Sequence, residues 1–160
     1  MPLPLSGDPG QRSFAGTIAP FEERKGVVDP SVVAELEGTH ASFRLYSDRV
    51  VLVRLNDGLN LDADVGHRHI AEMQQFVGEG PYVAVVDCRG LGYAPFGGRQ
   101  AVRDDISPSR LATALIIDTR VMDYVVRQYL EEAEYPVENA TFETEAAALA
   151  WGHEQIRLLG

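Results

Sequence analysis

The fold is decided by one segment in the middle of the chain, where an apolar run ends on an aspartate and opens into a glycine-rich loop. This segment reads Val83-Ala84-Val85-Val86-Asp87-Cys88-Arg89-Gly90-Leu91-Gly92 and continues to Phe96-Gly97-Gly98-Arg99. A short, continuous apolar run is typical of a strand buried between two layers of helices. In a parallel α/β sheet, ligands and partners dock just beyond the carboxyl ends of the strands. The segment therefore predicts a central strand over residues 82–87 and a candidate site in the loop after it.

Upstream of the central strand, the pattern predicts a hairpin and then a helix. Apolar positions indicate strands over 41–46 and 49–55, joined by the two-residue connection Ser47-Asp48. The first strand has little apolar character on its second face, as expected of an open sheet edge. Asp62 is expected to cap a helix that ends near residue 77.

The N-terminal part of the chain differs from the rest in composition. Residues 1–28 combine prolines and glycines with little periodicity, which predicts a flexible arm, and 29–160 are then expected to form a single domain. Asp29-Pro30 has the form of a helix start, and an apolar stripe follows before Gly38. These signals predict a two-turn helix over 30–37.

Downstream of the central strand, helical and strand patterns alternate. The expected elements are a helix over 97–105, a strand over 112–117, a helix over 120–134, a strand over 140–143 and a last helix capped by Thr144. Strands that alternate with helices require crossover connections. The fold class is therefore α/β, with a mostly parallel sheet, an N-terminal antiparallel hairpin strand and helices packed on the sheet.

With this order of elements, residues 41–158 resemble the STAS domain (the anti-sigma-factor-antagonist fold), and in particular uncharacterised bacterial proteins labelled STAS/SEC14-like. The segments that carry the resemblance are Asn60-Leu61-Asp62-Ala63-Asp64, Val85-Val86-Asp87, Ala112-Thr113-Ala114-Leu115-Ile116-Ile117, Pro136, Phe142-Glu143-Thr144-Glu145 and Ala150-Trp151. The resemblance implies a regulatory module that binds a protein partner. Related domains carry a phosphorylated serine or threonine after the central strand. Residues 88–99 contain neither, so the resemblance does not extend to that switch.

Composition and charge exclude several classes of partner. The chain has 160 residues, 14 Lys plus Arg and 24 Asp plus Glu, for a formal charge of −10. Such a balance repels phosphate backbones and anionic membranes, so we expect neither nucleic acid nor a membrane as partner. A single cysteine suits a reducing compartment, and with no signal peptide at the N-terminus the expected location is the cytoplasm.

The loop after the central strand supplies the candidate binding residues. They are the polar, glycine and aromatic members of the segment: Asp87, Arg89, Gly90, Gly92, Tyr93, Gly97, Gly98 and Arg99. The glycines permit close backbone approach, and a helix N-terminus with two arginines can hold an anion. A purely structural turn is the alternative, with the Asp87 carboxylate accepting N–H groups of its own loop.

Other chemistry-bearing residues point to packing. Cys88 has no evident activating partner, and His67 and His69 lie two apart on a helix and cannot share an ion, so neither a metal nor a cofactor is expected. The aromatic set Tyr124, Tyr129, Tyr135 and Trp151 is expected to be core, since Tyr129 and Trp151 lie on predicted core stripes, with the lining of an apolar pocket as the alternative.

Three functions follow from these observations. The first is a non-enzymatic module that docks a protein partner through residues 87–99 and the helix over 97–105, with self-association expected through the open sheet edge at 41–46 or through the arm. The second is a carrier of a small apolar or anionic ligand between the helix over 120–134 and the sheet. The third is an enzyme with Asp87 as base and Arg89 or Arg99 as anion clamp, although no catalytic motif supports it.

Overall fold

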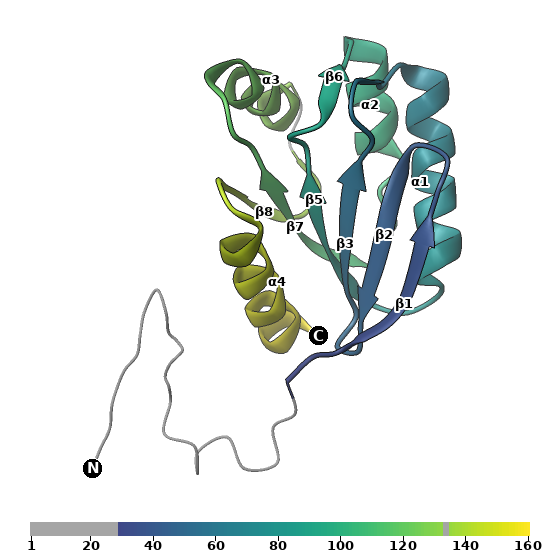
Figure 1. Cartoon of the computed structure of the whole chain (residues 1–160), viewed down its shortest axis with the longest axis vertical. Coiled ribbons are helices and arrows are strands. Elements are labelled where there is room, and N and C mark those ends of the chain that lie inside the picture. The colour runs from purple at the N-terminus through teal and green to yellow at the C-terminus, as the bar shows by residue number, and fades with distance from the viewer. Residues whose placement is uncertain (1–28, 133–134) are drawn as a thin grey trace, which may run out of the picture. The chain divides into compact units, whose positions relative to one another are not determined.

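A six-stranded sheet in the order β1-β2-β3-β5-β7-β8 forms the centre of the computed structural model, which describes residues 29–132 and 135–160 (Figure 1). The strands are β1 (Val32–Glu37), β2 (Ala41–Tyr46), β3 (Val50–Leu55), β5 (Tyr82–Asp87), β7 (Arg110–Ile116) and β8 (Glu138–Phe142). Strands β1, β2 and β3 are antiparallel, whereas β3, β5, β7 and β8 run parallel. The predicted α/β class, with its antiparallel start and parallel remainder, is confirmed.

Helices cover both faces of the parallel strands. They are α1 (Ala63–Val77), α2 (Phe96–Asp104), α3 (Arg120–Glu131) and α4 (Glu145–Leu159). Each step from β3 to β5, β7 and β8 moves to the next strand in the same direction, so right-handed crossovers place α1, α2 and α3 on one face. Helix α4 follows the last strand and packs on the other face (Figure 1).

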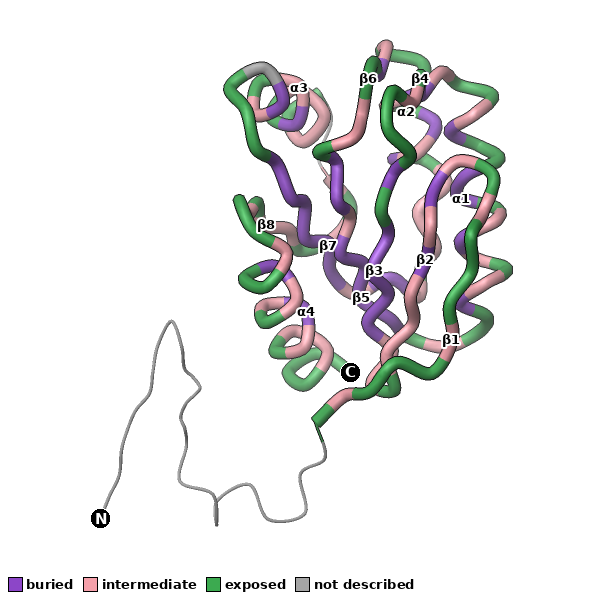
Figure 2. The backbone as a smooth tube through the Cα atoms, in the orientation of Figure 1, coloured by how far each residue is buried: buried purple, intermediate pink, exposed green. Residues whose placement is uncertain are grey.

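The core consists of two apolar layers, one on each side of the sheet. Val51, Val53 and Leu115 face α1 and α3, whereas Val50 and Val85 face α4. Apolar side chains on both faces are the reason that β3, β5 and β7 read as continuous hydrophobic runs. Figure 2 shows the buried residues concentrated in these three strands.

The helix starts agree with the expected capping residues. The Asp62 carboxylate accepts the N–H of Val65 at 2.9 Å, and the Thr144 hydroxyl accepts the N–H of Ala147 at 3.2 Å. Both contacts satisfy backbone donors that have no partner inside the helix.

The helix predicted over 30–37 is wrong, because these residues form strand β1. Two adjacent β-branched valines, Val32 and Val33, favour the extended backbone, and the pairing of Leu36 with Phe43 completes the ladder of β2. The prediction that 41–46 forms the sheet edge is wrong for the same reason. The edge is β1, and 58% of Val33 is exposed.

Two short strands, β4 (Leu59–Asn60) and β6 (Leu91–Tyr93), pair in parallel outside the main sheet and were not predicted. Their backbone hydrogen bonds connect the loop after β3 to the loop after β5. Strand β7 begins at Arg110, two residues before the predicted start, which brings this arginine into the sheet. The arm predicted over residues 1–28 lies outside the described residues, and residues 31–160 form one compact unit.

Candidate functional site

Asp87, at the carboxyl end of β5, is held by its own loop. Its carboxylate accepts the backbone N–H of Arg89 at 3.0 Å and two guanidinium contacts from the same residue, at 2.9 and 2.8 Å. Burial raises the pKa of Asp87, but the hydrogen bonds and charge of Arg89 outweigh it, so the pKa lies below its ordinary value. A carboxylate held in this way is a poor proton acceptor near neutral pH, which weakens its assignment as a catalytic base.

The glycines after Asp87 allow backbones to approach closely. A Cβ on Gly92 would lie 2.9 Å from the backbone of Gly58, and one on Gly98 would lie 1.6 Å from the carbonyl oxygen of Leu61. The N–H of Gly98 donates to the carbonyl of Pro95 at 3.0 Å. The N-terminus of α2 is thus packed against the segment before α1, with one of its N–H groups bonded inside the turn, a geometry that favours the structural alternative for this glycine.

Arg99 is paired with Glu132, at the carboxyl end of α3. Its Nε lies 3.1 and 3.0 Å from the two carboxylate oxygens, its Nη2 also contacts Glu132, and its Nη1 donates to the carbonyl of Ala94 at 2.6 Å. The hydrogen bonds to Glu132 raise the pKa of Arg99, and those from Arg99 lower the pKa of Glu132. Both arginines proposed from the sequence as anion clamps therefore have a carboxylate partner within the chain.

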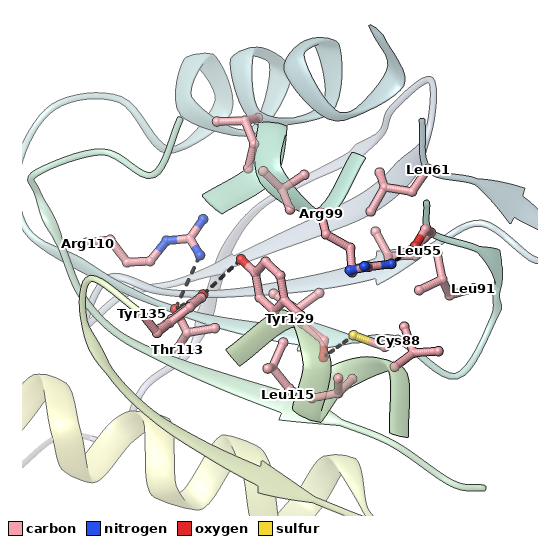
Figure 3. Close-up of a pocket in the computed structure, with 16 residues that line it drawn as sticks. Leu55, Leu61, Cys88, Leu91, Arg99, Arg110, Thr113, Leu115, Tyr129 and Tyr135 are labelled. Atoms are coloured by element: carbon pink, nitrogen blue, oxygen red, sulfur yellow. Dashed lines mark hydrogen bonds between the residues drawn. The ribbon is translucent and has the colours of Figure 1, made fainter. Parts of the chain in front are cut away.

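An apolar pocket of about 80 Å³ lies between α3 and the sheet, beside α1 and α2 (Figure 3). Aliphatic side chains form most of its wall: Leu55, Leu61, Ile70, Val86, Leu91, Ala94, Val102, Leu115, Val125 and Val126. Cys88, Arg99, Arg110, Thr113, Tyr129 and Tyr135 complete the lining. The pocket lies where the sequence suggested a ligand site, between the α3 segment and the sheet.

The structure separates the loop residues that the sequence grouped together. Of the eight, Arg99 lines the α3 pocket, while Asp87, Arg89 and Gly90 border a different, shallow depression beside Asp57. Tyr93 projects from β6 and is 64% exposed.

The polar end of the α3 pocket is formed by Arg110 and hydroxyl groups. The Arg110 Nε lies 3.3 Å from the Tyr82 hydroxyl, Nη1 lies 3.2 Å from the Thr113 hydroxyl, and Nη2 lies 3.7 Å from the Met73 sulfur. The Tyr135 hydroxyl donates to Thr113 at 3.4 Å. Arg110 is only 5% exposed, and it has no carboxylate partner among the residues that the structure describes.

Burial and the positive charge of Arg110 both affect the pKa of His69. This histidine is buried on α1, where burial and the positive charge of Arg110 lower its pKa to about 4. The ring is therefore neutral near pH 7, and its Nδ1 has no hydrogen-bond partner. His67 lies on the outer surface of the same helix, with its Nδ1 2.6 Å from Asp105.

Cys88 serves as part of the apolar wall. Burial, with a smaller contribution from Asp87, raises the pKa of its thiol to about 12, and the sulfur lies 3.8 Å from the carbonyl of Val86. A protonated, buried thiol is not a nucleophile.

Sequence reasoning missed Arg110, because the strand was expected to begin only at residue 112. It placed Thr113 inside that strand but not in the site. The tyrosine set was identified in part: Tyr129 and Tyr135 line the pocket, whereas Tyr124 is 62% exposed. Trp151 packs against Phe142 on the α4 face, with ring centroids 5.8 Å apart. An arginine at the first position of an apolar strand is the signal that could have identified this end of the pocket.

Comparisons with known proteins give a family and a structural similarity. No curated protein matches the chain. A solved structure, described as an uncharacterised DUF3478-family protein with a SpoIIAA-like fold from Shewanella loihica PV-4, is similar over 77% of this chain and 93% of its own, with 12% identity and a TM-score of 0.49. In the described part of the chain, no helix has the length and apolarity that a bilayer crossing requires. A family model described as a domain of unknown function (DUF7793) matches residues 44–155, and the chain belongs to this family.

Proposed function

We propose that the chain is a non-enzymatic binding protein for a small, largely apolar molecule held in the α3 pocket. The observation that carries this proposal is the pocket itself, whose aliphatic wall ends in a few polar groups, Arg110, Thr113 and Tyr135. Binding sites for small molecules have this composition: apolar walls take up most of the ligand, and few polar groups orient it.

The volume of the pocket limits the size of the ligand. Its 80 Å³ is about half of the ~150 Å³ of an engineered cavity that holds benzene. A body of a few carbon atoms fits this space, whereas a sterol or a long acyl chain does not. Any longer substituent of the ligand extends beyond the pocket.

Titration with 1-butanol tests the proposal. Methyl NMR spectra of the protein are expected to show saturable shifts at Ile70 and Leu115, which line the pocket. The variant Ala94→Leu fills part of the space and is expected to abolish these shifts, whereas the control Ala150→Leu, on the exposed surface of α4, retains them. Equal binding by the two variants, or no saturable shift in the unmodified protein, would contradict the proposal.

A second candidate function is docking of a protein partner, or of a second copy of the chain, through residues 87–99. The observation that favours it is a pair of exposed aromatic residues beside this loop, Tyr93 at 64% and Phe96 at 54%. Aromatic residues are enriched at the centres of protein interfaces.

Photo-crosslinking in host cells tests this second candidate. The double variant Tyr93→Ser/Phe96→Ser is expected to lose a crosslinked species that the control Tyr124→Ser retains, because Tyr124 is equally exposed on α3. Sedimentation of the purified protein distinguishes a second copy from another partner. If the double variant retains the crosslinked species, this loop is not the docking surface.

A further inference from the structure

We infer that the ligand of the α3 pocket carries one carboxylate group, which pairs with the buried guanidinium of Arg110. This inference rests on the proposed function and adds the chemical class of the ligand. Arg110 is buried, it lines the pocket, and it has no carboxylate partner within the described part of the chain.

The guanidinium has more donors than the described structure satisfies. It carries five N–H groups, and within the described residues it donates to the hydroxyls of Tyr82 and Thr113 and to the sulfur of Met73, a weak acceptor. Its central carbon also lies 5.7 Å from the centroid of the Tyr82 ring, a cation–π contact that brings no negative charge. Two N–H groups and the full positive charge remain, because arginine is not deprotonated in proteins. A buried charge is normally paired, since removal from water is otherwise strongly unfavourable.

Another buried arginine shows the usual arrangement. Arg103 is 7% exposed, and its Nη1 lies 3.5 Å from the Glu132 carboxylate. Arg89 and Arg99 likewise have Asp87 and Glu132 as partners. Within residues 29–132 and 135–160, the groups that Arg110 contacts are all neutral, and a bound ligand would supply the missing negative charge.

The pocket geometry favours a carboxylate with a short apolar body. Arg110, Thr113 and Tyr135 gather at one end, and Leu91 and Leu61 lie at the other (Figure 3). The two oxygens of a carboxylate match the planar fork of a guanidinium, and the hydroxyl groups are additional donors. The 80 Å³ of space beyond them takes a chain of a few carbons.

The local charges favour a single negative charge over a phosphate dianion. Arg99, the other cation in the lining, contacts the Glu132 carboxylate, and the pKa of His69 is lowered to about 4, so this ring is uncharged at pH 7. Arg110 is therefore the cation of the described lining without a carboxylate contact, and a monocarboxylate supplies one negative charge at that position.

Butanoate and its neutral isostere butanamide test the inference by the same methyl NMR titration. The unmodified protein is expected to bind butanoate about tenfold more tightly or better, the ratio that a charge-assisted hydrogen bond provides. Arg110→Met is expected to remove this preference while butanamide affinity stays unchanged. The control Arg54→Gln removes a positive charge that is paired with Glu145 outside the pocket, and the preference is expected to persist.

A second measurement does not depend on the fold of any variant. With butanoate labelled by ¹³C at the carboxyl carbon, the pKa of the bound acid is measured in the unmodified protein. Pairing with Arg110 is expected to lower that pKa below the value of free butanoate, whereas an apolar site without a cation raises it. A raised pKa would overturn the inference.

The outcomes separate the two proposals. If butanoate and butanamide bind equally, and Arg110→Met changes neither, the pocket remains a ligand site and the carboxylate assignment is wrong. If neither compound and no alkanol binds, the proposed function itself fails, and the assignment fails with it.

Discussion

Replacement of Arg110 by methionine is expected to stabilise the ligand-free protein against unfolding. Methionine has a similar length and is expected to pack against Met73 and Tyr82, whereas the guanidinium it replaces is buried with no carboxylate partner among the described residues. Most substitutions of buried residues destabilise a protein. An increase in stability would therefore identify Arg110 as a residue kept for a purpose other than folding.

The magnitude follows from the contacts of the side chain. Replacement of buried ionic groups by apolar residues of similar volume stabilises proteins by up to about 4 kcal/mol. The Tyr82 hydroxyl then loses its contact to Arg110, at a cost of about 1 kcal/mol, whereas Thr113 keeps its contact to Tyr135. The expected net change is a gain of up to about 3 kcal/mol in the free energy of unfolding.

Urea denaturation at pH 7, without added ligand and followed by Trp151 fluorescence, measures this change. The matched control is Arg103→Met, which removes a buried arginine that has a carboxylate partner, and it is expected to destabilise the protein. If Arg110→Met lowers the free energy of unfolding by more than about 1 kcal/mol with an unchanged urea dependence, Arg110 is a structural residue and the reasoning is wrong.

Three further predictions concern packing and titration. Gly98→Ala is expected to destabilise the protein by about 2 kcal/mol or more, because the new Cβ would lie 1.6 Å from the Leu61 carbonyl oxygen. The control Gly97→Ala places a Cβ 3.6 Å from that of Ala63, an ordinary contact, and is expected to change the free energy of unfolding little. Equal urea midpoints for the two variants would contradict this prediction. His69 has a pKa of about 4 in the folded protein and about 6.5 in the unfolded chain. Its neutral form therefore contributes fully to the free energy of unfolding above pH 6.5, and this contribution, about 3 kcal/mol, is lost as the pH falls from 6.5 to 4. His69→Gln should flatten the profile, and an unchanged slope would refute the assignment. Cys88, with a pKa of about 12, should resist iodoacetamide at pH 8 until the protein is unfolded, and rapid labelling of the folded protein would show that the thiol is accessible.

Much of the fold could be predicted because local signals and tertiary structure agree. The continuous apolar run before Asp87 identified a central strand, and Asp62 and Thr144 occupy the capping positions expected of them. In each case the residues that set the local backbone also form the contacts that the domain requires.

The error at residues 30–37 has a different origin. Val32, Val33 and Leu36 satisfy one turn of helical spacing as well as a short strand. The decision comes from the pairing of β1 with β2, in which Leu36 lies opposite Phe43. Nothing in the segment itself encodes that pairing, because the partner strand lies across a separate turn.

The candidate site was predicted in location better than in chemistry. The loop after β5 contributes Cys88, Leu91, Ala94 and Arg99 to the α3 pocket, as its position at the ends of parallel strands implies. The charges expected to hold an anion, Arg89 and Arg99, are paired with carboxylates instead. Ion pairing across the fold depends on three-dimensional neighbours, and in the described lining of the pocket it leaves Arg110 without a carboxylate partner.

A crystal structure determined with saturating butanoate tests the central claim most directly. The account predicts that butanoate lies in the α3 pocket, with a carboxylate oxygen about 3 Å from the Arg110 guanidinium and its chain against Leu115 and Val126. An empty pocket, or butanoate bound only elsewhere on the protein, would contradict it.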